Sequence, residues 1–339
     1  MTSEIYDNNT LLNTASGSFS ATLSGLSENT TYYYQAVMTL AVGSDVEGAV
    51  RSFKTSSAST TINRAYLDCY EIPSVSVNSY SSDTETYGNT KYHAYGTSNS
   101  MQRVVTHTFA YNGTKRNYSM LYDGNKRAAL WVAFAMNTGS YPWLVERTDD
   151  WEYDPAIDHS WQPVLYSAYA SSDTYARGHQ AAAHDRETTD DQVKQTTYFS
   201  NMTPQLSGFN GGVWSSLEMD IQKIGNATSG RDTLYVVTGP IFGSGYGTTK
   251  DKSGNVCAVP THYYKCIMRV SFSTSGVAQS ANGAAYLLKH ESGATRQEVK
   301  IDYIESLTGF DFFANVPQSL QTAAENETHP TSYFPQKSF

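Results

Sequence analysis

An arginine and a histidine two residues apart are the first residues of this sequence whose types and spacing suggest chemistry. Arg177 and His179 stand in the tetrapeptide Arg177-Gly178-His179-Gln180. An exposed imidazole can accept a proton from water near neutral pH, and a guanidinium can hold a phosphate oxygen through its fork of N–H donors. Residues i and i+2 of a strand point to the same side, so a strand here would turn both side chains toward one phosphodiester. Gly178 would leave room for the substrate backbone.

Further polar residues follow this tetrapeptide within about 40 positions. They stand in the segments Ser200-Asn201-Met202-Thr203-Pro204-Gln205 and Asn210-Gly211-Gly212-Val213-Trp214-Ser215-Ser216-Leu217-Glu218. Each has an ordinary structural interpretation. Asn210 could cap a helix, Asn201 could form an Asx-turn before Thr-Pro, and Glu218 could lie on a solvated helix face.

Taken together, the order Arg-Gly-His-Gln, Ser-Asn-x-Thr-Pro-Gln and Asn-x-x-x-Trp-x-x-Leu-Glu resembles the DNA/RNA non-specific endonuclease family. These are the sugar-non-specific members of the ββα-metal nucleases. The phrases at 131–134, 235–242, 259–265 and 304–313 agree with the family, so the resemblance spans most of residues 66–320. It implies an α+β fold, with a mixed or antiparallel central sheet, and an enzyme that hydrolyses phosphodiester bonds of DNA and RNA.

The resemblance also implies a role for each polar residue. His179 takes the position of the general base, and Arg177 matches the phosphate-binding arginine. Asn210 takes the position of the direct protein ligand to one divalent cation, Mg²⁺ or alternatively Mn²⁺ or Ca²⁺; hard cations of this kind prefer oxygen ligands. Glu218 would hold a metal-bound water, and Asn201 would orient the region between the metal and the histidine.

The sequence departs from the family pattern at two points. A second arginine usually precedes a Trp-x-x-Asp-Pro phrase; here the phrase begins at Trp151, and the nearest candidate, Arg147, stands slightly farther upstream than expected. The family also has Asp directly before Arg-Gly-His, where this chain has Ala176. We expect Ala176 to lower catalytic efficiency without abolishing activity.

The overall charge limits how nucleic acid could be bound. The chain has 339 residues and a net charge of −9, which counts against binding through one large basic face. We expect a local cleft that contacts phosphates without reading sequence. Besides Arg177, the candidate cations for that cleft are Lys115, Arg116, Lys126, Arg127 and Arg186.

Hydrophobic patterns predict the elements that must position these residues. Apolar runs at 129–135 and 234–239 predict central strands, and alternation at 263–270 predicts another. Residues 211–224 have helical spacing, with Val213, Leu217, Ile221 and Ile224 on one face.

The N-terminal part has a different pattern. Residues 18–23, 31–38 and 49–55 are predicted as short strands. A Leu at 26 and a Tyr at 32 resemble the tyrosine corner of a fibronectin type III domain, and the match covers only the last half of such a domain. We therefore predict a partial fibronectin type III-like segment at 1–56, a linker at 57–65 and the nuclease domain at 66–339.

The cysteines bear on whether a zinc site is present, and the composition bears on the cellular location. Cys69, Cys257 and Cys266 form no CxxC pair, so a cysteine-based zinc site is not expected; one disulfide with a free thiol and three free thiols both stay open. The sequence contains no run of 18 apolar residues, so it predicts no membrane span. The surface rich in Tyr, Ser and Thr, with few charges, favours a secreted, periplasmic or cell-surface protein.

Two other functions compete with nuclease activity. One is a binding or adhesion protein whose nuclease fold is catalytically weakened, as Ala176 and the acidic balance would allow. The other is a zinc metallohydrolase, for which the sequence offers neither an HExxH motif nor a Cys/His cluster.

Overall fold

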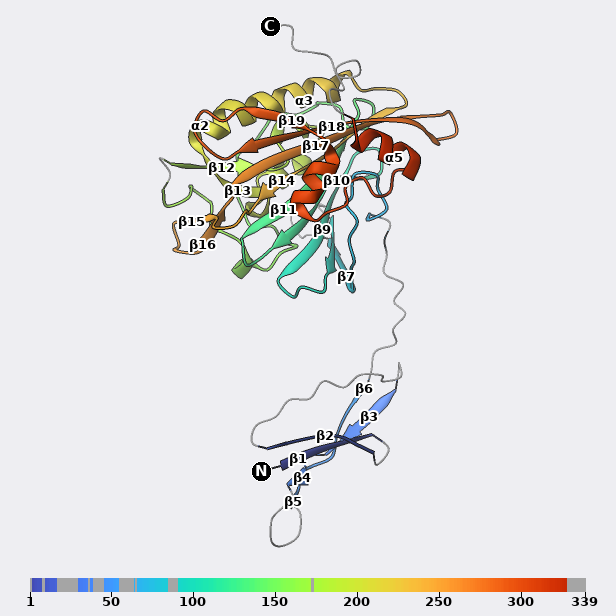
Figure 1. Cartoon of the computed structure of the whole chain (residues 1–339), viewed down its shortest axis with the longest axis vertical. Helices are drawn as coiled ribbons and strands as arrows, with labels where there is room; N and C mark the ends of the chain where they lie inside the picture. Colours follow the sequence, from blue (N-terminus) through green and yellow to red (C-terminus); the bar gives the residue numbers. More distant parts are fainter. Residues whose placement is uncertain are drawn as a thin grey trace. The chain divides into compact units, whose positions relative to one another are not determined.

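The structure is a computed structural model that describes residues 2–7, 10–16, 30–35, 37–38, 46–54, 64, 66–84, 91–171 and 174–327. Its contacts divide the chain into two compact units, Met1–Ile62 and Asn63–Phe339 (Figure 1). Within the described ranges, none of the helices combines the length and the apolar character needed to cross a membrane.

The described residues of the first unit form three antiparallel strand pairs. They are β1 (Thr2–Asp7) with β2 (Thr10–Ser16), β3 (Thr31–Tyr34) with β6 (Arg51–Lys54), and β4 (Val37–Met38) with β5 (Val46–Glu47). The predictions for 31–38 and 49–55 are confirmed in shortened form, whereas the strand predicted at 18–23 lies outside the described residues. The β1–β2 hairpin is not predicted by the sequence pattern, and the fibronectin-like interpretation stays a prediction.

The second unit is built on one nine-stranded sheet. Its order is β19-β18-β17-β14-β11-β10-β9-β8-β7, and all neighbours are antiparallel. The strands are β7 (Ser79–Thr84), β8 (Lys91–Gly96), β9 (Gln102–Ala110), β10 (Thr114–Asp123), β11 (Ala128–Met136), β14 (Asp232–Ile241), β17 (His262–Phe272), β18 (Ala278–Lys289) and β19 (Arg296–Val299). The strands predicted from the apolar runs are β11 and β14, which lie inside the sheet as expected, and the strand predicted from alternation is β17, which pairs with β14.

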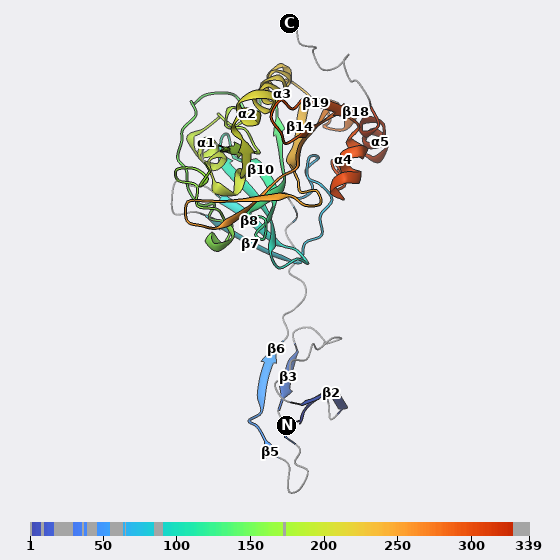
Figure 2. The same ribbon diagram turned by 60° about the vertical axis from the view of Figure 1, so that its left-hand side comes forward.

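Alternation along β17 explains how helices cover both faces of this sheet. Tyr263 and Lys265 face α3 (Ser215–Ala227) and the turn before it: Tyr263 contacts Phe209 and Trp214, and Lys265 contacts Trp214. Tyr264 points the other way and its ring contacts Phe312 in a tilted arrangement, beside α4 (Ile301–Thr308) and α5 (Gln318–Glu325). In Figure 2, α4 and α5 lie on one side of the strands and α1 (Asp190–Thr196) and α2 (Ser207–Phe209) on the other. Residues 263, 264 and 266–268 of β17 are buried apolar residues, as expected of a strand covered on both faces, and Lys265 is the buried exception.

A small two-stranded sheet lies on the same face of the nine-stranded sheet as α3, the helix that follows it. Strand β12 (Tyr175–His179) pairs with β13 (Met202–Leu206), and the chain then continues through α2 and the turn η4 (Asn210–Trp214) into α3. The sequence predicts a helix over 211–224. The helix proper begins at Ser215 instead, because η4 is a π-turn in which Gly212 departs from helical geometry, with φ −107° and ψ −109°. The expected buried face is present at Leu217, Ile221 and Ile224.

The remaining elements are short. They are β15 (Gly247–Lys250) paired with β16 (Val256–Val259), and the 3₁₀ turns η1 (His159–Trp161), η2 (Ala183–Asp185) and η3 (Phe199–Asn201). The long segment between β11 and β12 is held by a small core around Leu165, Phe199 and Met202, against which Trp151 packs. The predicted α+β class, with an antiparallel central sheet and a ββα unit, is confirmed.

Candidate active site

The pairing of β12 with β13 positions the Arg-Gly-His tripeptide. Arg177 lies opposite Pro204, Gly178 opposite Thr203, and His179 opposite Met202. A Cβ atom at Gly178 would collide with the side chain of Gln205 on β13. The expectation that this glycine leaves room for substrate is therefore wrong, since the space that it leaves is filled by Gln205.

Arg177 is held flat against an aromatic ring. Its guanidinium carbon lies 3.6 Å from the centroid of the Trp151 ring, and its Nη1 donates to the carbonyl of Leu165 at 3.0 Å. Burial lowers the pKa of Arg177, yet an arginine remains charged at neutral pH. Among the described residues its Nε and Nη2 have no hydrogen-bond partner, so the guanidinium keeps donors for a phosphate oxygen.

His179 lies beside the same ring, with its imidazole centroid 5.5 Å from that of Trp151. The sequence pattern predicts an exposed histidine, whereas the side chain is only partly accessible and its Nε2 is fully buried. Burial, reinforced by the positive charge of Arg147, lowers the pKa of His179 to about 3. In the described part of the chain Nδ1 has no hydrogen-bond partner either, and unlike Nε2 it is not fully buried. The imidazole is thus neutral at neutral pH, with one nitrogen able to accept a proton.

Arg147, the candidate second arginine, is close enough to Arg177 and His179 for its charge to act on both. It forms a salt bridge with Asp149 at 3.0 Å, and its side chain is 38% exposed. The charges of Arg147 and Asp149 both act on Arg177 and His179. Asp149 thus brings a carboxylate to the region where Ala176 lacks one.

Asn201 is completely buried and all its amide groups are used by the backbone. Its Nδ2 donates to the carbonyls of Ala181 (3.0 Å) and Thr196 (2.7 Å), and its Oδ1 accepts from the Ala181 amide at 2.9 Å. The Asn201 carbonyl also accepts from the Gln180 amide. These bonds fasten the chain that leaves β12 to the chain that enters β13, and they leave no group of Asn201 for a metal ion or substrate.

Asn210 is the first residue of the π-turn η4 and is partly exposed. Across the described ranges its side chain forms no hydrogen bond with protein groups. Its backbone amide closes the short helix α2 by donating to the Ser207 carbonyl. The alternative that its side chain caps a helix is not supported, and its carboxamide oxygen stays available.

Glu218, whose side chain is 20% exposed, forms part of a largely buried charged cluster. Its Oε1 lies 3.8 Å from Nζ of Lys265, a lysine that is 1% exposed and whose ammonium stands 4.4 Å from the Trp214 ring centroid. Burial raises the pKa of Glu218 to about 7 against the opposing effect of Lys265, and burial raises the pKa of nearby Asp185 to about 6. Glu218 is therefore not the solvated helix-face residue that its isolated position would allow.

The turn η2 lies between the residues around His179 and the cluster around Glu218. His184, in η2, contributes to the electrostatic surroundings of both His179 and Asp185, and its carbonyl accepts a hydrogen bond from Gln222 of α3. Lys265 and Asp185 are given no role by the sequence pattern. A lysine inside the otherwise apolar run 263–268 is the signal that could have found the first.

Most of the candidate phosphate-binding cations are engaged elsewhere. Arg186 is fully buried and donates to the carbonyls of Asn117 and Ala135, and Arg116 pairs with the buried Glu71. Arg127 donates to two backbone carbonyls near η1, and Lys126 pairs with Asp123. These four candidate cations therefore all contact groups of the protein itself. All three cysteines are free thiols.

Several known nucleases are similar to this chain. The chain is 30% identical over 222 residues to a nuclease of Nostoc sp., covering 63% of this chain and 77% of that protein. It is 31% identical over 217 residues to nuclease C1 of Cunninghamella echinulata, covering 59% and 81%. A solved structure of the EndoG/EndoGI complex contains a chain with 25% identity and a TM-score of 0.48, with 63% of this chain and 88% of that chain covered.

The family model described as DNA/RNA non-specific endonuclease matches residues 98–319. This match confirms the predicted nuclease function and phosphodiester hydrolase activity, and the adhesion-protein alternative is not favoured. The chain belongs to the DNA/RNA non-specific endonuclease family, whose members depend on a metal ion.

Proposed function

We propose that His179 is the general base of a sugar-non-specific endonuclease. The observation that carries this proposal is the placement of Arg177 and His179 on β12 against Trp151, with the imidazole neutral and its Nδ1 available. A water that attacks phosphorus would give its proton to Nδ1. Cleavage of the bond to the 3′-oxygen would leave a 5′-phosphate end. General-base assistance of this kind contributes roughly 10²- to 10⁴-fold to a rate.

Asn210 and Glu218 fit a hard divalent cation, for which we propose Mg²⁺, with Mn²⁺ or Ca²⁺ as the alternatives. The Asn210 oxygen has no partner among the described residues, and Oε1 of Glu218 is buried without a hydrogen-bond partner. Asn210 would bind the ion directly, and Glu218 would orient its hydration shell. When bound, such an ion stabilises negative charge on the phosphate by several kcal/mol.

The other predicted residues act on substrate or on geometry. Arg177 would hold a non-bridging phosphate oxygen, and Arg147 would stabilise charge that develops in the transition state. Asn201 would be a positioning residue, because its amide is consumed by the backbone on both sides of β12 and β13. These groups address phosphate, so we propose binding of DNA and RNA without sequence preference.

Cleavage assays test the proposal directly. Purified full-length chain should degrade plasmid DNA and RNA in Mg²⁺ and lose this activity in EDTA. His179→Ala should reduce the rate about 1,000-fold while circular dichroism stays unchanged. His159→Ala is the matched control, since His159 is an exposed histidine that stacks on Tyr153. Wild-type cleavage by His179→Ala would contradict the mechanism.

We also propose that the enzyme acts outside the cytoplasm, in a secreted, periplasmic or cell-surface form. The support is compositional: 26 tyrosines in a chain with only 16% charged residues. Fractionation of cells that express the native gene would test it, and activity confined to the cytoplasm would contradict it.

A further inference from the structure

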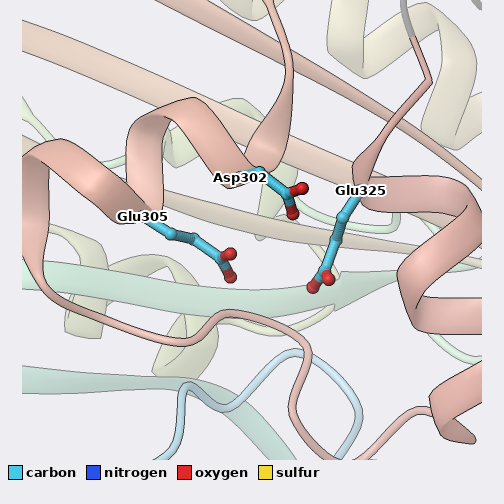
Figure 3. A group of neighbouring side chains, drawn as sticks. All are labelled: Asp302, Glu305 and Glu325. Atoms are coloured by element: carbon cyan, nitrogen blue, oxygen red, sulfur yellow. The ribbon is translucent and has the colours of Figure 1, made fainter.

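Three carboxylates from two helices converge on the opposite side of β17 from the candidate active site. Asp302 and Glu305 belong to α4, and Glu325 ends α5. One oxygen from each lies within 4.8 Å of one oxygen from each of the others. Figure 3 shows the three side chains pointing toward a common space between the helices.

Glu325 is the most buried of the three acids. Its side chain is 6% exposed, and its Oε1 is buried with no hydrogen-bond partner. Its carboxylate points toward the other two acids (Figure 3). A buried, unpartnered carboxylate oxygen is costly unless something compensates it, so this oxygen indicates a missing partner.

The geometry around Glu325 is fixed by the fold. Oε1 of Glu305 accepts a hydrogen bond from the Phe312 amide at 2.6 Å, which sets the direction of that carboxylate. Gly283 of β18 lets both helices approach closely, because a Cβ atom there would collide with the Ala324 carbonyl and with Ile301. The three acids are therefore held in place by helix packing.

The cluster also lacks a counter-charge. Within the described residues no lysine, arginine or histidine forms a salt bridge with any of the three acids. Carboxylates held this close together without a counter-charge repel one another unless a cation lies between them.

We propose that Asp302, Glu305 and Glu325 form a structural binding site for a divalent cation of the Ca²⁺ type, which fastens α4 to α5. Ca²⁺ takes six to eight oxygen ligands in flexible geometry at about 2.3–2.6 Å, which suits carboxylate oxygens that lie within 4.8 Å of one another. Mg²⁺ demands near-ideal octahedral geometry and usually keeps several of its waters, so it suits a cluster of three carboxylates less well. Waters would complete the coordination, since Asp302 and Glu305 are partly accessible.

Thermal unfolding of the metal-stripped full-length chain tests this site. Adding Ca²⁺ to roughly tenfold above its Kd should raise Tm by about 3 °C or more. Glu325→Gln should abolish this rise, and it should unfold no lower than wild type in EDTA because it removes an uncompensated charge. Asp302→Asn, at a partly accessible position, is the milder second variant and should weaken Ca²⁺ binding in calorimetry.

Two control variants show whether the Ca²⁺ response comes from this cluster. Glu291→Gln removes an exposed carboxylate that pairs with Lys289, and it should keep the Ca²⁺-dependent rise in Tm. Asn210→Ala should keep it as well, which excludes binding at the candidate active site as its source. If Glu325→Gln keeps the full Ca²⁺ response, or wild type binds no Ca²⁺ in calorimetry, the acids share protons without an ion and the proposal is wrong.

Discussion

At the scale of single residues, the chemistry depends on how burial changes charge. His179 is neutral because Trp151 and the surrounding strand pair remove water from its ring and Arg147 adds a positive charge nearby. The pKa of Glu218 is raised to about 7 because burial outweighs the attraction of Lys265. Neither effect follows from residue type alone.

The protonation of His179 gives a test by pH. Its pKa is lowered to about 3 in the folded protein, from an ordinary value near 6.5, so the unfolded chain binds the proton more strongly. Stability from this group is therefore complete above pH 6.5 and declines as pH falls toward 3. In NMR titrations of the free enzyme, the His179 ring resonances should stay unchanged between pH 8 and pH 5. A titration midpoint near 6.5 would refute this.

The proposed role of Asn210 as a metal ligand can be tested by varying the metal concentration. Asn210→Ala removes the proposed oxygen ligand, so the Mg²⁺ concentration that gives half-maximal cleavage should rise by roughly 10- to 100-fold. Asn210→Asp keeps an oxygen at the same position and should show a smaller change. The measurement is the cleavage rate as a function of Mg²⁺. An unchanged curve for Asn210→Ala would show that Asn210 is not a ligand.

At the scale of elements, the site depends on close pairing of β12 and β13. Gly178 and Gln205 fill one space across the two strands, and Asn201 ties their ends through backbone bonds. Strand β17 places side chains on both faces of the large sheet. Lys265 contacts Glu218 of α3, while its neighbours Tyr264 and Cys266 are buried on the other face.

Gly178→Ala tests the strand pair. The added methyl group must displace the Gln205 side chain, and overpacking of this kind costs about 1–3 kcal/mol of unfolding free energy. Because Arg177 and His179 flank the position, cleavage should fall as well. Denaturant unfolding and activity should both recover in the double variant with Gln205→Ala. Failure of the double variant to recover either would mean that Gly178 serves another purpose, such as substrate access.

At the scale of the whole molecule, the family match and the candidate active site both lie within one unit. The matched residues 98–319 fall inside the unit Asn63–Phe339, and so do all the proposed catalytic residues. The first unit contributes none of them. We infer that catalysis does not require it.

Truncation tests that independence. A chain of residues 63–339 should cleave plasmid DNA with kcat/KM within about twofold of the full chain, because a unit with its own core is expected to fold alone. Circular dichroism would establish that it is folded. A folded truncation that loses most of its activity would place a functional role in residues 1–62.

Local sequence patterns predicted the central strands, but they did not predict the features that depend on tertiary packing. The apolar runs that became β11 and β14 were predicted because a doubly buried strand is apolar along most of its length, and β17 was predicted from alternation. The π-turn before α3 was not: Gly212 departs from helical geometry there, between Phe209 and Trp214, whose rings both contact Tyr263.

The sequence by itself determined the family and the order of Arg177, His179, Asn210 and Glu218 along the chain, because residue identity and spacing are properties of the chain alone. Only the tertiary structure decided which charges are available. It buried Arg186 in the fold, used every amide group of Asn201, and brought Lys265 to Glu218 from a strand 47 positions away in sequence. The reason is physical: desolvation and pairing arise from long-range packing, and these set the pKa of a group and whether it can reach a ligand.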